Sequence, residues 1–169
     1  MNTSEDTASS PAEPSQADLE LLNRAISLAR AARDRGDHPF GALLLAPDGA
    51  MVEAMNTVNT EHDPTGHAET NLVRLSAKKL DAAALAGSTL YTSTEPCAMC
   101  TGAIYWAGIG RVVYALSEKD LASIVTEQSG VPTLDLPCRE VLAHGGSNVS
   151  VIGPVPLPEA TEVHLGFWH

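Results

Sequence analysis

Two short segments of the sequence carry side chains that could meet at a single metal ion. The first is His67-Ala68-Glu69, and the second is Pro96-Cys97-Ala98-Met99-Cys100. Structural zinc sites are normally closed by four protein ligands, whereas catalytic sites have three and leave the fourth position to water. The pattern therefore predicts one catalytic zinc ion per chain, held by His67, Cys97 and Cys100. Glu69 would remain outside the ligand set, free to move protons.

Both segments are expected to stand at the start of a helix. Pro96 suits a first helical turn, where its missing N–H is no loss. Cys97 and Cys100 would share a helix face, and the dipole of the N-terminus would favour their thiolates. His67 and Glu69 are two positions apart, so they converge only if the site caps the first turn of their helix. The prediction therefore requires two helix N-termini to meet at the metal.

Other uses of a Cys-x-x-Cys pair agree less well with the sequence. A zinc ribbon needs a second ligand pair, and the sequence has no second Cys-x-x-Cys. A redox pair would not explain the His-x-Glu segment. Three cysteines are an odd number and too few for a disulfide framework, and Cys138 is expected to be a buried free thiol.

Composition indicates one globular domain, residues 17–169, after a disordered leader at residues 1–16. No apolar run approaches the length of a membrane span, and no secretory signal is evident, so a cytoplasmic enzyme is expected. Ten basic residues face 21 acidic ones, for a net charge of −11. This balance makes a nucleic-acid substrate unlikely and favours a small neutral one.

Hydrophobic spacing and turn residues predict strands that alternate with helices. We expect helices over residues 18–35, 65–80, 96–108, 118–128, 139–144 and 159–165, and strands over 41–46, 51–55, 89–92, 111–116 and 149–152. Such alternation predicts a sheet with helices on both faces.

The H-x-E…P-C-x-x-C signature is that of zinc nucleobase deaminases. From about Leu19 to Ile152 the chain resembles the cytidine deaminase-like superfamily. Its segment from Pro96 to Leu116 is similar to bacterial guanine deaminases of that fold, and tRNA adenosine deaminases share the spacing from Asn56 to His67. The resemblance implies a three-layer α/β/α sandwich with a central five-stranded mixed sheet, a homodimer and one zinc ion per subunit.

The expected reaction is hydrolytic removal of an amine from a cyclic amidine. Bound zinc would lower the pKa of a water molecule to about 7. Glu69 would take the proton, pass it to a ring nitrogen and then protonate the leaving amine, which departs as ammonia. Proton shuttling of this kind contributes about 10²- to 10⁴-fold to a rate.

The resemblance also implies substrate contacts. Phe40 would form an apolar wall, Asn56 would bond a ring carbonyl or nitrogen, the Ala68 backbone N–H would bind a carbonyl oxygen, and Trp106 would help to enclose a purine. The alternatives are core or dimer contacts for Phe40 and Trp106 and a turn for Asn56.

Two further roles are expected from the same resemblance. Glu127 is the nearest candidate for a second proton-carrying acid by its distance from Cys97, and its alternative is a solvated helix face. Phe167, Trp168 and His169 could close over a small ligand as a lid, or simply anchor the end of the chain.

The favoured hypothesis is a deaminase of free nucleobases, guanine first, with cytosine, isocytosine or amino-s-triazines such as ammeline as further substrates. The alternatives are a tRNA adenosine deaminase acting at the wobble position, a cytidine or guanosine deaminase, and a zinc-containing binding protein without turnover. The motif alone does not separate these possibilities.

Overall fold

The computed structural model describes residues 12–169. Seven helices and five strands are found there: α1 (Gln16–Asp34), β1 (Gly41–Leu45), β2 (Met51–Met55), α2 (Ala68–Ala77), α3 (Ala82–Ala86), β3 (Thr89–Thr94), α4 (Ala98–Ala107), β4 (Arg111–Leu116), α5 (Glu118–Ser129), α6 (Cys138–Ala143), β5 (Ser150–Ile152) and α7 (Pro158–Glu162). Among these described residues, no helix is long and apolar enough to cross a membrane.

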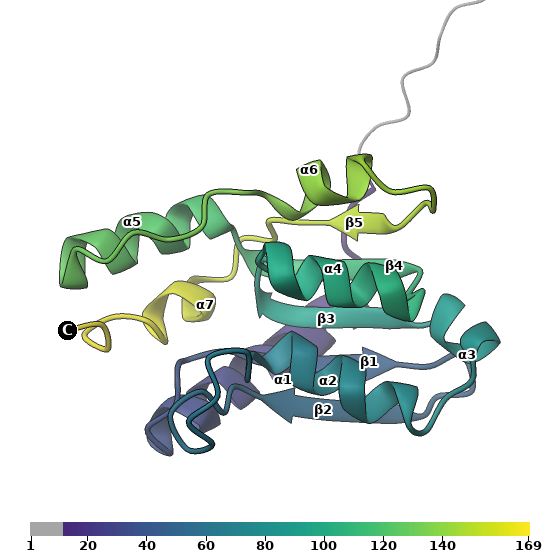
Figure 1. Ribbon diagram of the computed structural model, residues 1–169, viewed down its shortest axis with the longest axis horizontal. Coiled ribbons are helices and arrows are strands. Elements are labelled where there is room, and N and C mark those ends of the chain that lie inside the picture. The colour runs from purple at the N-terminus through teal and green to yellow at the C-terminus, as the bar shows by residue number, and fades with distance from the viewer. Residues whose placement is uncertain (1–11) are drawn as a thin grey trace, which may run out of the picture.

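The strands form one mixed sheet in the order β2-β1-β3-β4-β5 (Figure 1). β1 is antiparallel to both β2 and β3, whereas β3, β4 and β5 run parallel. The predicted five-stranded mixed sheet is thus confirmed.

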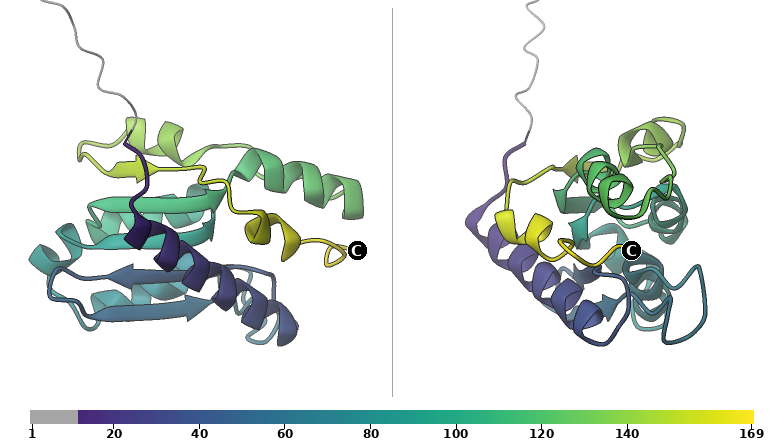
Figure 2. Two further views of the ribbon diagram at one scale, coloured as in Figure 1. Left: turned by 180° about the vertical axis from the view of Figure 1, so that it is seen from behind. Right: turned by 90° about the vertical axis from the view of Figure 1, so that its left-hand side faces the viewer.

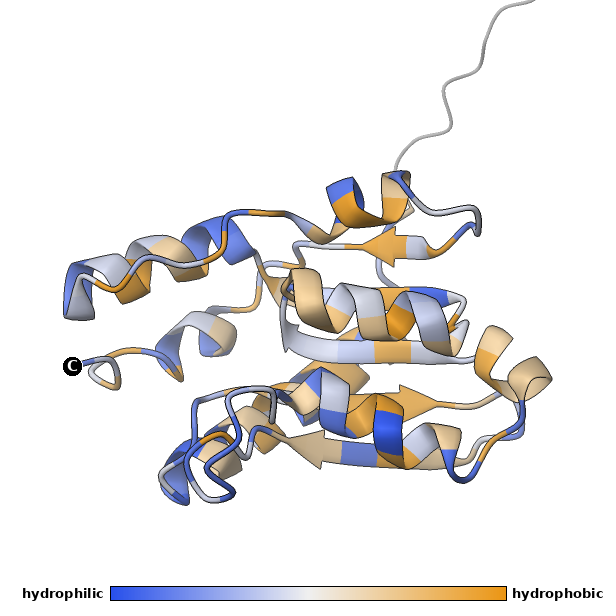
Figure 3. Cartoon of the chain, in the orientation of Figure 1, coloured by the Kyte–Doolittle hydropathy of each residue, from blue (hydrophilic) through white to orange (hydrophobic). Residues whose placement is uncertain are grey.

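Helices cover both faces of this sheet. α1 and α7 lie on one face, and the two views of Figure 2 show α2 and α4 on the other. β1 serves both layers, because Leu43 packs in the α1 core whereas Ala42 and Leu44 pack in the α2 and α4 core. Figure 3 shows β1 as a strongly hydrophobic strand between the two helix layers. The α/β/α architecture agrees with the prediction.

Close packing of α1 against the sheet depends on Gly41, the first residue of β1. A Cβ atom built there would lie 2.4 Å from the backbone oxygen of Ala25 and 2.4 Å from the nitrogen of Ala29, both in α1. Any larger residue would force the helix away from the strand.

The parallel strands β3 and β4 end at the same edge of the sheet. Thr94 is paired with Leu116, and the Glu95 N–H donates to the Leu116 carbonyl at 2.7 Å. Residues that follow these two strands are therefore neighbours in space. Sites of α/β proteins commonly lie at this carboxyl edge.

Several boundaries differ from the predictions. The predicted leader ends too late, because Ser15 caps α1 in a reciprocal capping box with Asp18 and Gln16 is already helical. Residues 1–11 of that leader lie outside the described residues. The helix α3 was not predicted, and α7 ends at Glu162 instead of 165.

Candidate active site

Two helix N-termini meet in this site, as the sequence required. His67 is the N-cap of α2, with φ −71° and ψ 150°, and Cys97 is the N-cap of α4, with φ −64° and ψ 171°. Neither side chain makes the usual capping hydrogen bond to its own helix. α2 and α4 pack side by side (Figure 1), so both cap side chains are available for a shared ligand.

The separations of the three ligand atoms fit a tetrahedral zinc ion. His67 Nδ1 lies 3.6 Å from Cys97 Sγ and 3.5 Å from Cys100 Sγ. Tetrahedral bonds of about 2.0 Å to nitrogen and 2.3 Å to sulfur would separate such atoms by about 3.5 Å. All three ligand atoms lie within 4.8 Å of one another. His67, Cys97 and Cys100 are therefore placed to bind a metal ion, and their separations suit zinc.

The electrostatics of the cysteines agree with metal binding. Hydrogen bonds from Cys100 and from His67 lower the pKa of the Cys97 thiol to about 4, whereas Cys97 and burial raise the pKa of Cys100. Cys97 therefore forms a thiolate readily at the start of α4. A bound metal cation would stabilise the negative charge of a second thiolate, at Cys100.

Glu69 lies beside the metal ligands without belonging to them. Its side chain is 4% exposed, and its Oε1 accepts a hydrogen bond from the Thr92 hydroxyl at 2.8 Å. Its Oε2 lies 3.5 Å from Cys100 Sγ. Burial, and then the charge of Cys97, raise the pKa of Glu69. A buried carboxyl group with a raised pKa is suited to taking and returning a proton.

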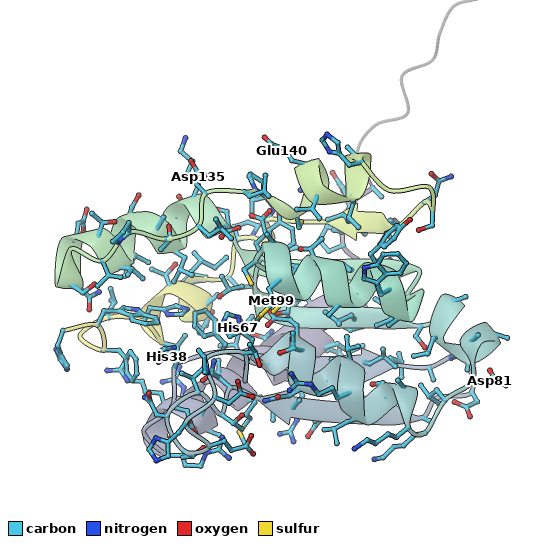
Figure 4. All side chains as sticks on the ribbon, viewed as in Figure 1. His38, His67, Asp81, Met99, Asp135 and Glu140 are labelled. Atoms are coloured by element: carbon cyan, nitrogen blue, oxygen red, sulfur yellow. The ribbon has the colours of Figure 1, made fainter. Side chains whose placement is uncertain are left out.

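A cavity of about 460 Å³ opens beside this centre. That volume is in the usual range for small-molecule sites. Figure 4 shows His67 and Met99, two of its lining residues, close together at the starts of α2 and α4. His38, a third lining residue, lies farther toward the C-terminal tail. The lining residues are His38, Phe40, Pro64, His67, Glu69, Glu95, Cys97, Met99, Glu118, Leu121, Val125, Val131, Pro132, Thr133, Leu134 and Trp168.

The C-terminal tail, residues 163–169, contributes one wall of the cavity. Trp168 stacks on the buried His164, with ring centroids 6.1 Å apart and planes at 11°, and it approaches His38 at 5.1 Å. Phe40 lies 6.0 Å from Trp168 and lines the cavity beside it, where an apolar wall was predicted. Phe167 packs instead against the Arg33 guanidinium, and His169 is exposed. Of the predicted lid residues, the structure places Trp168 at the cavity.

Trp106 lies away from the site. Its side chain is 86% exposed and packs edge-on against Tyr105. Among residues 12–169, the cavity lining does not include it. Within one chain, Trp106 is therefore not placed at the cavity, because this part of α4 faces outward, and its role toward a purine stays a prediction.

Asn56 and Ala68 are buried near the site. The Oδ1 atom of Asn56 accepts a hydrogen bond from the Val58 N–H at 3.0 Å, which is the turn role considered as its alternative. Ala68 is the first residue of α2, where backbone N–H groups have no partner within the helix.

Glu127, the candidate for a second proton-carrying acid, does not line the cavity. Glu127 is exposed and lies over a different surface hollow, with Lys119 and Thr126. Two other acids, Glu95 and Glu118, line the cavity and are 8% and 7% exposed. The sequence contained part of the signal for Glu118, because Ser117 is an N-cap residue between a predicted strand and a predicted helix. The parallel pairing that brings this start of a helix to the site was not part of it.

Comparison with known proteins gives one family and several relatives. The family described as cytidine and deoxycytidylate deaminase zinc-binding region matches residues 15–116. A probable cytosine deaminase of Schizosaccharomyces pombe is 41% identical over 161 residues, which cover 94% of this chain and 97% of that protein. Guanine deaminase of Bacillus subtilis is 40% identical over 122 residues, 71% of this chain and 78% of that protein.

A solved structure shows the same fold. The chain superimposes on guanine deaminase from Nitrosomonas europaea with a TM-score of 0.68 and 22% identity, over 94% of this chain and 88% of that one. This likeness agrees with the mixed five-stranded sheet described above.

Proposed function

Because this chain belongs to the cytidine and deoxycytidylate deaminase family and is a zinc-dependent deaminase, we propose that it acts on free nucleobases, with guanine as the first candidate. The observation that carries the proposal is the three-ligand centre with Glu69 beside it at the wall of a cavity. A site closed by four protein ligands would leave no position for a reacting water.

The reaction follows from the position of Glu69. When bound, zinc supplies an activated water molecule. Glu69 takes a proton from that water and delivers it to the ring nitrogen next to the amine-bearing carbon. It then takes the remaining proton from the oxygen that has attacked the carbon and transfers it to the amine. A C–O bond forms, the C–N bond breaks, and ammonia leaves. Thr92 holds the Glu69 carboxyl group in place during both transfers.

Guanine is supported by the similarity to the guanine deaminase of B. subtilis and by the apolar part of the cavity lining. Apolar side chains from α5 and from residues 131–134 extend the cavity beyond the metal centre, which gives a second ring a surface to lie on. The exposed Trp106 no longer supports this choice.

Cytosine is the second candidate because a relative that matches along 97% of its own length is described as a probable cytosine deaminase. Guanine and cytosine both carry an amidine next to a ring carbonyl, so one centre can serve either base.

The charge around the cavity favours a free base over tRNA. Three glutamates line the cavity, and its lining among residues 12–169 contains no lysine or arginine. A rim that binds phosphates needs such cations. The homodimer and the cytoplasmic location expected from the sequence stay predictions.

The test is a panel of ammonia-release assays with purified zinc-loaded protein. It should include guanine, cytosine, isocytosine, adenine, ammeline, guanosine, cytidine and a tRNA carrying a wobble adenosine. We expect turnover of guanine, or of cytosine as second candidate, and none of tRNA. Activity on tRNA or nucleosides without activity on any free base would overturn the proposal.

A further inference from the structure

Glu118 is a buried acid in the cavity for which the reaction above has no role. It is the first residue of α5, its side chain is 7% exposed, and it lines the cavity together with the metal ligands His67 and Cys97. Its Oε2 atom is buried and has no hydrogen-bond partner among the described residues. It also lies beyond residues 15–116, which the family matches.

The backbone of Glu118 is held firmly at this position. Its N–H donates to Glu95 Oε2 at 2.9 Å, and the Cys138 N–H donates to Glu95 Oε1 at 2.9 Å. Both oxygens of Glu95 are thus occupied by backbone groups. Glu118 is therefore the acid of this pair with an oxygen left for a ligand.

An unpaired buried carboxyl oxygen is costly to a folded protein unless a ligand satisfies it. The protein itself offers no cation here, since the described cavity lining contains neither lysine nor arginine. Burial, and then the charge of Glu95, raise the pKa of Glu118 to about 8. Neutral or ionised, the carboxyl group has an oxygen that can accept a hydrogen bond. The missing partner is a donor.

Free nucleobases carry a suitable donor that does not take part in the reaction. In cytosine it is the N1–H, across the ring from C4, where the amine is replaced. In guanine it is the N9–H of the five-membered ring, three bonds from C2 on the edge that also carries N3. Both N–H groups are lost in nucleosides, because the sugar is attached at that nitrogen.

Resting on the proposed function, we propose that Glu118 accepts a hydrogen bond from the ring N–H that nucleosides lack, and so selects free bases over nucleosides. The metal and Glu69 act at the amine-bearing carbon, and Glu118 binds the ring N–H, which lies across the ring in cytosine and beyond N3 in guanine. A sugar at that nitrogen would remove the donor and place bulk against Glu118 and the neighbouring Leu121.

The experiment compares each free base with its N-methylated form, cytosine with 1-methylcytosine and guanine with 9-methylguanine. The methyl group removes the donor but adds little bulk. In wild type we expect a lower kcat/KM for the methylated base by about 10-fold, as for the loss of one hydrogen bond. In Glu118→Leu, kcat/KM for the free base should fall to that of the methylated base.

Two further variants separate this role from a structural one. Glu118→Gln keeps an acceptor oxygen and should restore most of the discrimination. Glu127→Leu makes the same chemical change on the same helix but outside the cavity, and should behave as wild type. Zinc content and thermal unfolding show whether each variant is folded.

The outcomes distinguish this proposal from the proposed function. If wild type deaminates no free base, the proposed function fails. If it deaminates free and methylated bases equally well, or if Glu118→Leu lowers both to the same extent, the role of Glu118 is overturned while the proposed function stands. The wild-type comparison decides the matter even if Glu118→Leu does not fold.

Discussion

The hydrogen bond from Thr92 to Glu69 decides where the proton carrier points. The Thr92 side chain is fully buried in β3, and its hydroxyl lies 2.8 Å from Glu69 Oε1. Because the strand fixes Thr92, the carboxyl group is held relative to the metal ligands at the starts of α2 and α4. Its remaining oxygen can then face the cavity.

Thr92→Val removes this hydrogen bond and nearly preserves the shape of the side chain. We expect kcat to fall about fivefold with little change in KM, because loss of one hydrogen bond of about 1 kcal/mol displaces a group used in the transition state. Zinc content should not change. Steady-state ammonia release measures the effect, and Thr92→Ser is the matched control. Equal rates for the Val and Ser variants would contradict this role.

Sequence reasoning succeeded for residues whose placement is local. His67, Cys97 and Cys100 were predicted because their spacing relative to a helix start fixes their direction. Trp106 and Glu127 do not line the cavity, because the side of a helix that faces a cavity depends on packing against the rest of the chain. Trp106 lies on the outer side of α4, and Glu127 lies beyond the first turn of α5.

At the scale of elements, a network of hydrogen bonds around Asp18 joins α1 to the sheet. Asp18 is 3% exposed and accepts two hydrogen bonds from Arg111 of β4, at 2.9 and 2.8 Å. The Tyr91 hydroxyl of β3 donates to the same carboxylate at 2.8 Å. These contacts hold the helix against two strands without touching the cavity.

Asp18→Asn should therefore affect stability and leave catalysis intact. With Arg111 30% exposed, we expect the free energy of unfolding to fall by about 1–3 kcal/mol. The Arg111 hydrogen bonds hold the pKa of Asp18 well below its usual range. The contribution of Asp18 is thus present above its ordinary pKa and is lost as pH falls through the lowered one.

The difference between wild type and Asp18→Asn should accordingly shrink below about pH 4, near the ordinary pKa of an aspartate. Urea unfolding at pH 7 and pH 3 measures it. Glu20→Gln, an exposed acid on the same helix, is the control. A gap between wild type and Asp18→Asn that stays constant with pH would contradict the account.

The tail is docked through a histidine that is neutral in the folded state. His164 is fully buried between Phe40 and Trp168. Burial, and then the charge of Arg33, lower its pKa to about 4. The unfolded chain binds a proton at His164 below its ordinary pKa of 6.5, whereas the folded chain does not until about pH 4. Stability should therefore fall as pH drops through this window.

The loss at His164 is as much as about 3 kcal/mol over these 2.5 pH units. His164→Phe does not titrate and keeps a ring between Phe40 and Trp168. Urea unfolding at pH 7 and pH 4.5 should show a smaller acid-induced loss for this variant than for wild type. Equal losses in the two proteins would show that His164 does not become charged on unfolding.

Most elements could be predicted because strands and helices leave periodic patterns in the sequence. α3 could not, since its five residues, Ala82–Ala86, have too little periodicity to distinguish a helix from a turn. The position of Glu118 depended on the parallel pairing of β3 with β4. That pairing is a long-range contact, which spacing along the chain does not reveal.

In the whole molecule, three distant parts of the chain build one cavity. The starts of α2 and α4 bring the metal ligands, the edge after β3 and β4 brings Glu95 and Glu118, and the tail brings Trp168. Arg33 Nη1 fixes the tail by hydrogen bonds to the carbonyls of Val163 at 2.6 Å and Leu165 at 2.9 Å. The α/β/α class could be predicted from alternation and resemblance, but the Arg33 contacts that fix the tail could not, because they join residues far apart in the sequence.

The central claim is that Glu69 moves protons beside a metal that it does not bind. The most direct test measures zinc content and ammonia release for wild type and Glu69→Gln in parallel. We predict about one zinc ion per chain in both proteins, with the three-ligand site intact, and a loss of at least about 10²-fold in ammonia release for the variant. A variant that loses its zinc, or that releases ammonia as fast as wild type, would contradict the account.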